Sequence, residues 1–163
     1  MLKRVVILLF SLLLPWYTFG EQGFVQGPFK ISQDYDIYIK KENSVDYPLG
    51  LYLDNNGVSN KIDRYETEGD TPNIETVFFI TLKGLKNVIV LVSWHQIHRA
   101  ESINGTQYKV YGYTFNNGRL VPNEEISKDS MLMGDDGEFN GDTFNFKYKT
   151  ADKIKKYLVK KYQ

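Results

Sequence analysis

The stretch that most constrains the fold spans residues 75–98 and reads ETVFFITLKGLKNVIVLVSWHQIH. Its β-branched and aromatic residues favour strands. A break at residues 83–86 separates two apolar runs, so we expect two adjacent strands joined by a tight turn. The second run begins apolar at odd and even positions alike, which indicates a strand covered on both faces. Either a helix covers one face or the sheet folds over itself as a sandwich or partial barrel.

Alternation of apolar and polar residues in other segments predicts further strands with one solvated face, as in antiparallel sheets. One such segment is 29–40, and another is 143–149, where every second residue is aromatic. Asn104-Gly105 and Asn117-Gly118 predict hairpin turns. Three remaining segments lack this alternation: 21–28 and 122–142 are interpreted as irregular, and 61–71 as either a loop or a polar strand.

The C-terminus has helical periodicity. Thr150 is a suitable N-cap and Asp152 is favourable in a first turn. Apolar residues recur at helical spacing on one face, which predicts that this face docks on a sheet. They are Ala151, Ile154, Tyr157, Leu158 and Tyr162. The predicted fold class is therefore α+β, with a mainly antiparallel β-sheet and a C-terminal amphipathic helix packed on it.

The N-terminus has the pattern of a secretory signal peptide. Lys3 and Arg4 precede an apolar run of about ten residues, after which Pro15 and the small residues Thr18 and Gly20 follow. We expect a signal peptide over residues 1–20 and a single β-rich domain over 21–163. An uncleaved anchor is the alternative. Since the chain has no cysteine, a bacterial envelope protein, periplasmic or secreted, is favoured over a disulfide-bonded extracellular domain.

The net charge of the chain argues against one class of partner, nucleic acids. Without residues 1–20 the chain has 18 basic and 20 acidic residues, which favours no nucleic-acid binding. Segment 121–142 carries seven acidic residues and one lysine, whereas the C-terminal segment is rich in lysine. We interpret the lysines as the solvated face of a docked helix and expect no stable membrane insertion of the mature chain. The oligomeric state stays open.

No motif specifies a reaction, so we expect neither an enzyme nor a cofactor. Ser93 and His95 lie two residues apart, but no nucleophile motif surrounds them. His95 and His98 could share a metal on a helix, but on a strand they would point to opposite faces. Segment 133–142 has the acids and glycines of a calcium loop without the EF-hand spacing, and a solvated loop is the preferred interpretation.

Two clusters are candidate contacts for a protein partner. The first is His95, His98 and Arg99, which we expect where a strand leaves the core at Trp94. The second is the acidic set Asp135, Asp136 and Glu138.

We therefore predict an exported protein-binding module. One concrete version is an immunity-type inhibitor that occludes a toxin active in the periplasm. A small-ligand or glycan-binding envelope protein, which would use exposed aromatics, is the alternative, and an envelope hydrolase is less favoured.

Overall fold

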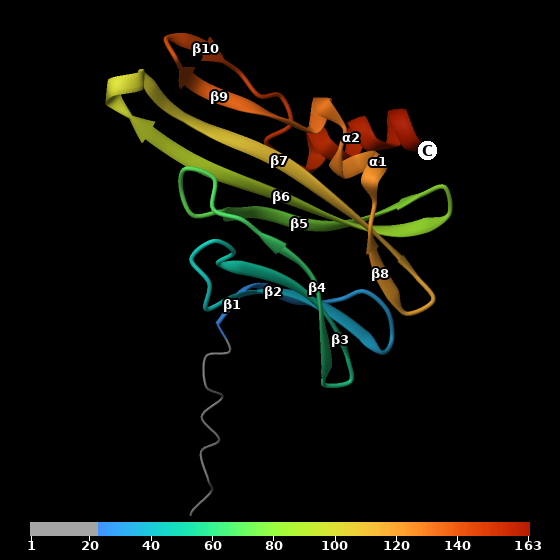
Figure 1. The fold of residues 1–163 in the computed structure, drawn as a ribbon. Helices are drawn as coiled ribbons and strands as arrows, with labels where there is room; N and C mark the ends of the chain where they lie inside the picture. Colours follow the sequence, from blue (N-terminus) through green and yellow to red (C-terminus); the bar gives the residue numbers. More distant parts are fainter. Residues whose placement is uncertain (1–22) are drawn as a thin grey trace, which may run out of the picture.

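The computed structural model describes residues 23–163, and the predicted signal peptide lies outside them. The strands form two antiparallel sheets that lie face to face (Figure 1). The smaller sheet has the order β1-β2-β3-β4, and the larger has the order β10-β9-β7-β6-β5, with β8 paired to β7. The strands are β1 (Phe24–Lys30), β2 (Tyr35–Lys41), β3 (Leu49–Asn55), β4 (Val58–Tyr65), β5 (Asn73–Leu82), β6 (Leu85–His98), β7 (Ile103–Asn116), β8 (Arg119–Pro122), β9 (Met133–Phe139) and β10 (Asp142–Phe144).

Helices form a third layer on the far face of the larger sheet (Figure 1). The C-terminal helix α2 (Ala151–Tyr162) is the longest of them, and α1 (Glu124–Ser127) is a single turn. Two 3₁₀ turns complete the described chain, η1 (Arg99–Glu101) and η2 (Ser130–Leu132). No helix within residues 23–163 is both long and apolar enough to cross a membrane.

Strand β6 lies at the centre of this arrangement and is covered on both faces. Val88, Val90 and Val92 belong to the core between the two sheets. Ile89 and Leu91 belong to the core between the larger sheet and the helices. The two explanations offered by its apolar pattern are therefore both realised, since a second sheet covers one face and helices cover the other.

The predicted α+β class with a docked C-terminal helix is confirmed. Thr150 caps α2 by accepting a hydrogen bond from the Lys153 backbone N–H at 3.4 Å. Ile154 and Leu158 are fully buried against the larger sheet. The β5–β6 turn also forms where it was expected, with Leu82 paired to Leu85.

Several segments differ from their predicted state. Segment 21–28, which was interpreted as irregular, contains the start of strand β1. Segment 61–71, which was left open between a loop and a polar strand, is a strand as far as Tyr65, where β4 ends. The predicted strand 143–149 is short, because β10 ends at Phe144. Phe146 and Tyr148 are nevertheless buried, as irregular chain under the helix layer. The acidic segment 122–142 contains α1, η2 and β9 in place of a long loop.

Asn104-Gly105 does not form a turn. Both residues lie inside β7, and the chain reverses earlier, at η1, where Ser102 adopts a left-handed backbone with φ 51°. The glycine serves packing instead. A Cβ at position 105 would lie 2.8 Å from Cζ of Phe139 and 2.9 Å from the backbone oxygen of Asp136. Strand β9 pairs with β7 here, and the Phe139 ring lies over position 105, which leaves room only for glycine.

Candidate functional site: the free end of the larger sheet

The covering layers of the larger sheet end at Trp94. This side chain is fully buried, and its Nε1–H donates to the backbone oxygen of Glu66 at 2.9 Å. Immediately beyond it, His95, Ile97 and His98 are exposed. In Figure 1 the ends of β6, β7, β9 and β10 extend past both α2 and the smaller sheet. We call this region the free platform; it comprises residues 95–98, 103–107, 135–139 and β10.

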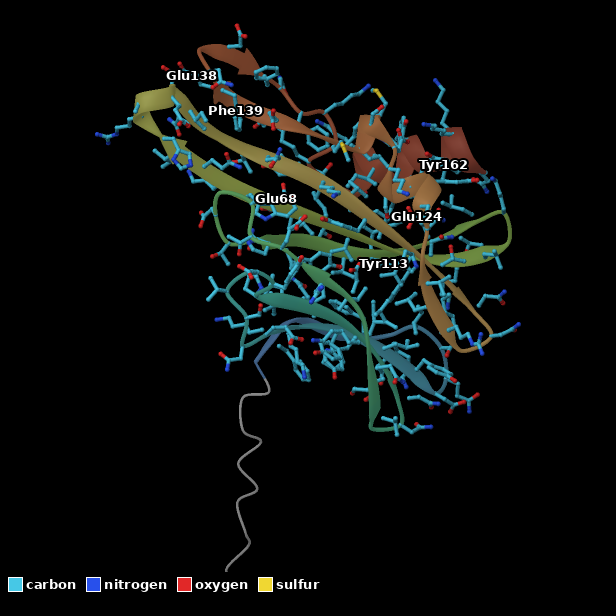
Figure 2. The ribbon with its side chains drawn as sticks, viewed as in Figure 1. Glu68, Tyr113, Glu124, Glu138, Phe139 and Tyr162 are labelled. Atoms are coloured by element: carbon cyan, nitrogen blue, oxygen red, sulfur yellow. The ribbon has the colours of Figure 1, made fainter. Side chains whose placement is uncertain are left out.

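Strand register brings the two predicted clusters together. His95 pairs with Thr106 of β7, which pairs with Asp136 of β9. Paired residues lie on the same face of a sheet, so these three share the face toward the helix layer. Glu138 lies two residues beyond Asp136 on that same face. Figure 2 shows Glu138 and Phe139 at the far end of the larger sheet.

The opposite face carries the other predicted residues. Asp135 pairs with Gln107, which pairs with Trp94, so this row faces the smaller sheet. His98 lies four residues beyond Trp94 on the same side. Arg99 begins η1 at the tip, where it is exposed. All six predicted residues thus gather at one end of the molecule but on two faces of the sheet.

Asp136 is engaged within the chain. Its Oδ1 accepts hydrogen bonds from Lys149 Nζ at 2.7 Å and from the Phe146 backbone N–H at 3.2 Å. Both donors belong to the segment that leads into α2. We therefore assign Asp136 the structural role of fastening that segment to β9, which separates it from Asp135.

Asp135 lies in a groove on the face toward the smaller sheet. Its Oδ1 is buried and has no hydrogen-bond partner among the described residues. The groove has a volume of about 230 Å³. Its lining comprises Glu68, Trp94, Gln107, Tyr108, Lys109, Met133, Gly134 and Asp135. A buried acceptor without a donor is unfavourable, so a donor from another molecule that displaces the atoms covering this oxygen would be bound favourably.

Glu68 adds to the acidic character of the groove. Burial raises the pKa of this carboxyl, and a hydrogen bond with Glu66 together with its negative charge raises the pKa further, while Lys109 partly offsets the effect. Figure 2 shows Glu68 on the loop between β4 and β5, beside the larger sheet. Because an entering cation would relieve the repulsion between the two glutamates, a lysine or arginine side chain suits this groove.

An aromatic pair on the same face was missed by sequence reasoning. The rings of Phe139 and Phe144 form an edge-to-face contact with centroids 6.3 Å apart. Phe144 is 43% exposed. The sequence signal for this contact was Gly105, over which the Phe139 ring lies, but Asn-Gly indicates a turn unless the register of β9 against β7 is known.

Gly105→Val is expected to lower the free energy of unfolding by about 1–3 kcal/mol, because the added side chain overpacks the space of the Phe139 ring. Chemical denaturation of residues 21–163 measures the change. The double variant Gly105→Val/Phe139→Ala removes the opposing ring and should be less destabilised than the sum of the two single variants. Additive losses would contradict the predicted contact.

The catalytic and metal hypotheses find no support in the geometry. Ser93 is buried and donates to Glu75 Oε1 at 2.6 Å, whereas His95 Nδ1 lies 3.1 Å from Thr106 Oγ1. His95 and His98 point to opposite faces, as expected on a strand. Strand β9 likewise separates Asp135 from Asp136, which is incompatible with a calcium loop. Within residues 23–163, no group of three or more His, Asp or Glu is arranged to hold a metal ion.

Comparison of the chain with protein-family models, with curated proteins and with solved structures gave no significant match.

Proposed function

We propose that the protein is an exported protein-binding module and that the free platform, together with the adjoining groove, is its contact surface. The observation that carries the proposal is the groove in which the buried Asp135 Oδ1 has no partner among the described residues. A partner's lysine or arginine placed there would satisfy this oxygen and offset the charge of Glu68. Such charge-assisted hydrogen bonds are among the stronger ones in proteins.

Apolar groups on both faces of the platform would contribute the remainder of the interface. Phe144 is 43% exposed on the groove face, and Ile97 is 57% exposed on the other face of the platform. Interfaces commonly combine an apolar or aromatic centre with a polar rim. The exposed His98 and Arg99 at the tip would form part of that rim.

The concrete version is an immunity-type inhibitor that acts in the periplasm. Export is supported by the signal-peptide pattern of residues 1–20. The platform projects from the sandwich as an extension of three strands and β10, a shape that can enter and occlude a partner's active-site cleft. Inhibition would then require no chemistry from this chain.

Site-specific photo-crosslinking in the producing cell tests the proposal. A photoreactive residue is placed at His98, Gln107 or Phe144 on the platform, and at Val45 or Val58 as controls, which are 88% and 65% exposed. A discrete adduct is expected from the platform positions alone. Adding Asp135→Ala and Glu68→Ala should suppress it, and mass spectrometry of the adduct would distinguish a toxin from another envelope protein.

Asp136 is left unchanged in these variants, because its removal would loosen the segment before α2 and confuse binding with stability. Adducts from Val45 and Val58 as strong as those from the platform would contradict the assigned surface. If platform adducts persist in the Asp135/Glu68 variant, the platform would still be the contact surface, but the groove would not be the site that anchors the partner.

A further inference from the structure

A second surface, distinct from the free platform, lies beside α2. It is a hollow of about 580 Å³, within the range of small-ligand sites. Its lining consists of five lysines and two tyrosines: Lys147, Tyr148, Lys153, Lys156, Tyr157, Lys160 and Lys161. No acidic side chain belongs to this lining. A concave surface of one charge sign concentrates ligands of the opposite sign.

Most of these ammonium groups are available to a ligand. Lys161 is paired with Asp129 at 2.9 Å. Among the described residues, no ion pair within 4.0 Å involves Lys147, Lys153, Lys156 or Lys160. All four are exposed. These four ammonium groups are therefore open to an anion from solution.

Two tyrosines pack together at the base of the hollow, where Tyr148 is largely buried. The rings of Tyr148 and Tyr157 contact each other with centroids 4.8 Å apart, and Lys147 Nζ lies 5.6 Å from the centroid of the Tyr148 ring. Tyr157 Oη is engaged by donating to Asp129 at 2.8 Å. A ligand with a compact apolar face between its charged groups fits such a lining better than an isolated inorganic ion.

Helical geometry sets the spacing of the charges. Lys153, Lys156 and Lys160 share one side of α2, and a rise of about 1.5 Å per residue separates them by ~4.5 and ~6 Å along the axis. These steps are close to the length of one sugar ring. An extended peptide would present acidic side chains on one side every ~6.6 Å, which is near the longer step but exceeds the shorter one.

The helix itself is unsuited to insertion in a lipid surface, because its apolar face is already in use. Ile154 and Leu158 are fully buried in the core beneath the larger sheet. An amphipathic helix binds a membrane by burying that face among the lipids. The lysine side is therefore left to recognise an anion from solution or from a polymer.

From these observations we infer that the hollow beside α2 binds a linear acidic saccharide, in which carboxylate or phosphate groups recur on successive rings. The site goes beyond the proposed partner surface and does not depend on it. Through this site the protein would bind an anionic glycan while the free platform stays available to a protein partner.

Calorimetric titration at fixed ionic strength, in calcium-free buffer, tests the inference. The probe is tetragalacturonate, with maltotetraose as its neutral counterpart and tetraglutamate and inorganic phosphate as non-saccharide anions. Only tetragalacturonate should bind well. The variant Lys153→Gln/Lys156→Gln/Lys160→Gln should weaken that binding about tenfold, from three exposed charge pairs.

A charge-matched control variant distinguishes binding in the hollow from non-specific electrostatic attraction to the whole protein. Lys30→Gln/Lys41→Gln/Lys83→Gln removes the same net charge from exposed positions away from α2 and should change the affinity less than twofold. Circular dichroism of both variants would verify folding. Equal losses in the two variants, equal binding of tetraglutamate or phosphate, or no binding of tetragalacturonate at millimolar concentration would each overturn the inference.

Discussion

Trp94→Ala is expected to lower the free energy of unfolding by about 3–5 kcal/mol, the usual cost of emptying the site of a large buried aromatic residue. The indole is fully buried between the two sheets. Its removal would also free the Glu66 carbonyl, to which Nε1 donates at 2.9 Å. Domains of this size have only about 5–15 kcal/mol of stability, so this one change removes a large part of it. Urea denaturation followed by far-ultraviolet circular dichroism measures the loss.

Two control variants separate the contributions of Trp94. Trp94→Phe keeps most of the ring but loses the hydrogen bond to Glu66, and should cost less than the alanine variant. Val58→Ala, at a side chain 65% exposed, should stay within about 0.5 kcal/mol of the parent. A loss below 1 kcal/mol for Trp94→Ala would contradict the central position assigned to this residue.

The second large effect is expected at Asp129, which ties α2 to the chain between α1 and η2. Its side chain is only 2% exposed. The carboxylate accepts hydrogen bonds from Tyr157 at 2.8 Å, Tyr162 at 2.8 Å and Lys161 at 2.9 Å. Asp129→Ala is expected to cost about 3 kcal/mol, because three donors lose their shared acceptor and a charge pair loses one member.

An exposed ion pair supplies the comparison. Lys128 and Glu124 lie 2.7 Å apart, and their side chains are 78% and 63% exposed. Glu124→Ala should therefore change the free energy of unfolding by about 0.5 kcal/mol or less. Similar losses for the two alanine variants in chemical denaturation would show that burial of Asp129 adds nothing to its role.

The same carboxylate gives the fold an acid-sensitive contribution. Burial by itself raises the pKa of Asp129, but hydrogen bonds from Lys161, Tyr162 and Tyr157 outweigh it and bring the pKa below the usual value for an aspartate. A lowered pKa in the folded state means that the contribution is present above the usual aspartate pKa. It is lost as the pH falls through the folded-state pKa. Asp129→Asn should make stability less dependent on pH in this acidic range.

Local sequence patterns were sufficient to predict those elements that depend on contacts between residues close together in the chain. The cap at Thr150, the amphipathic face of α2 and the β5–β6 hairpin depend on spacings of a few residues, and all three are present. The apolar run of β6 also predicted cover on both faces. Asn104-Gly105 shows the limit, because its role is decided by Phe139 from a strand more than thirty residues later.

The arrangement of the candidate site could not be predicted from the sequence and became visible only in the tertiary structure. The sequence selected His95 and Asp135 for separate reasons, and nothing local indicates that β7 would lie between their strands. The sequence also could not assign different roles to Asp135 and Asp136. The two neighbours differ only in the face of β9 that each occupies. That face determines whether a carboxylate meets Lys149 or has no partner among the described residues.

By itself, then, the sequence determined the fold class, the buried strand at its centre and the docked final helix, because periodicity and capping are short-range properties of the chain. Only the tertiary structure decided the order of the strands and the grouping of charges into an acidic groove and a lysine-lined hollow. These features arise from pairings between segments far apart in the chain, whose register no local pattern records.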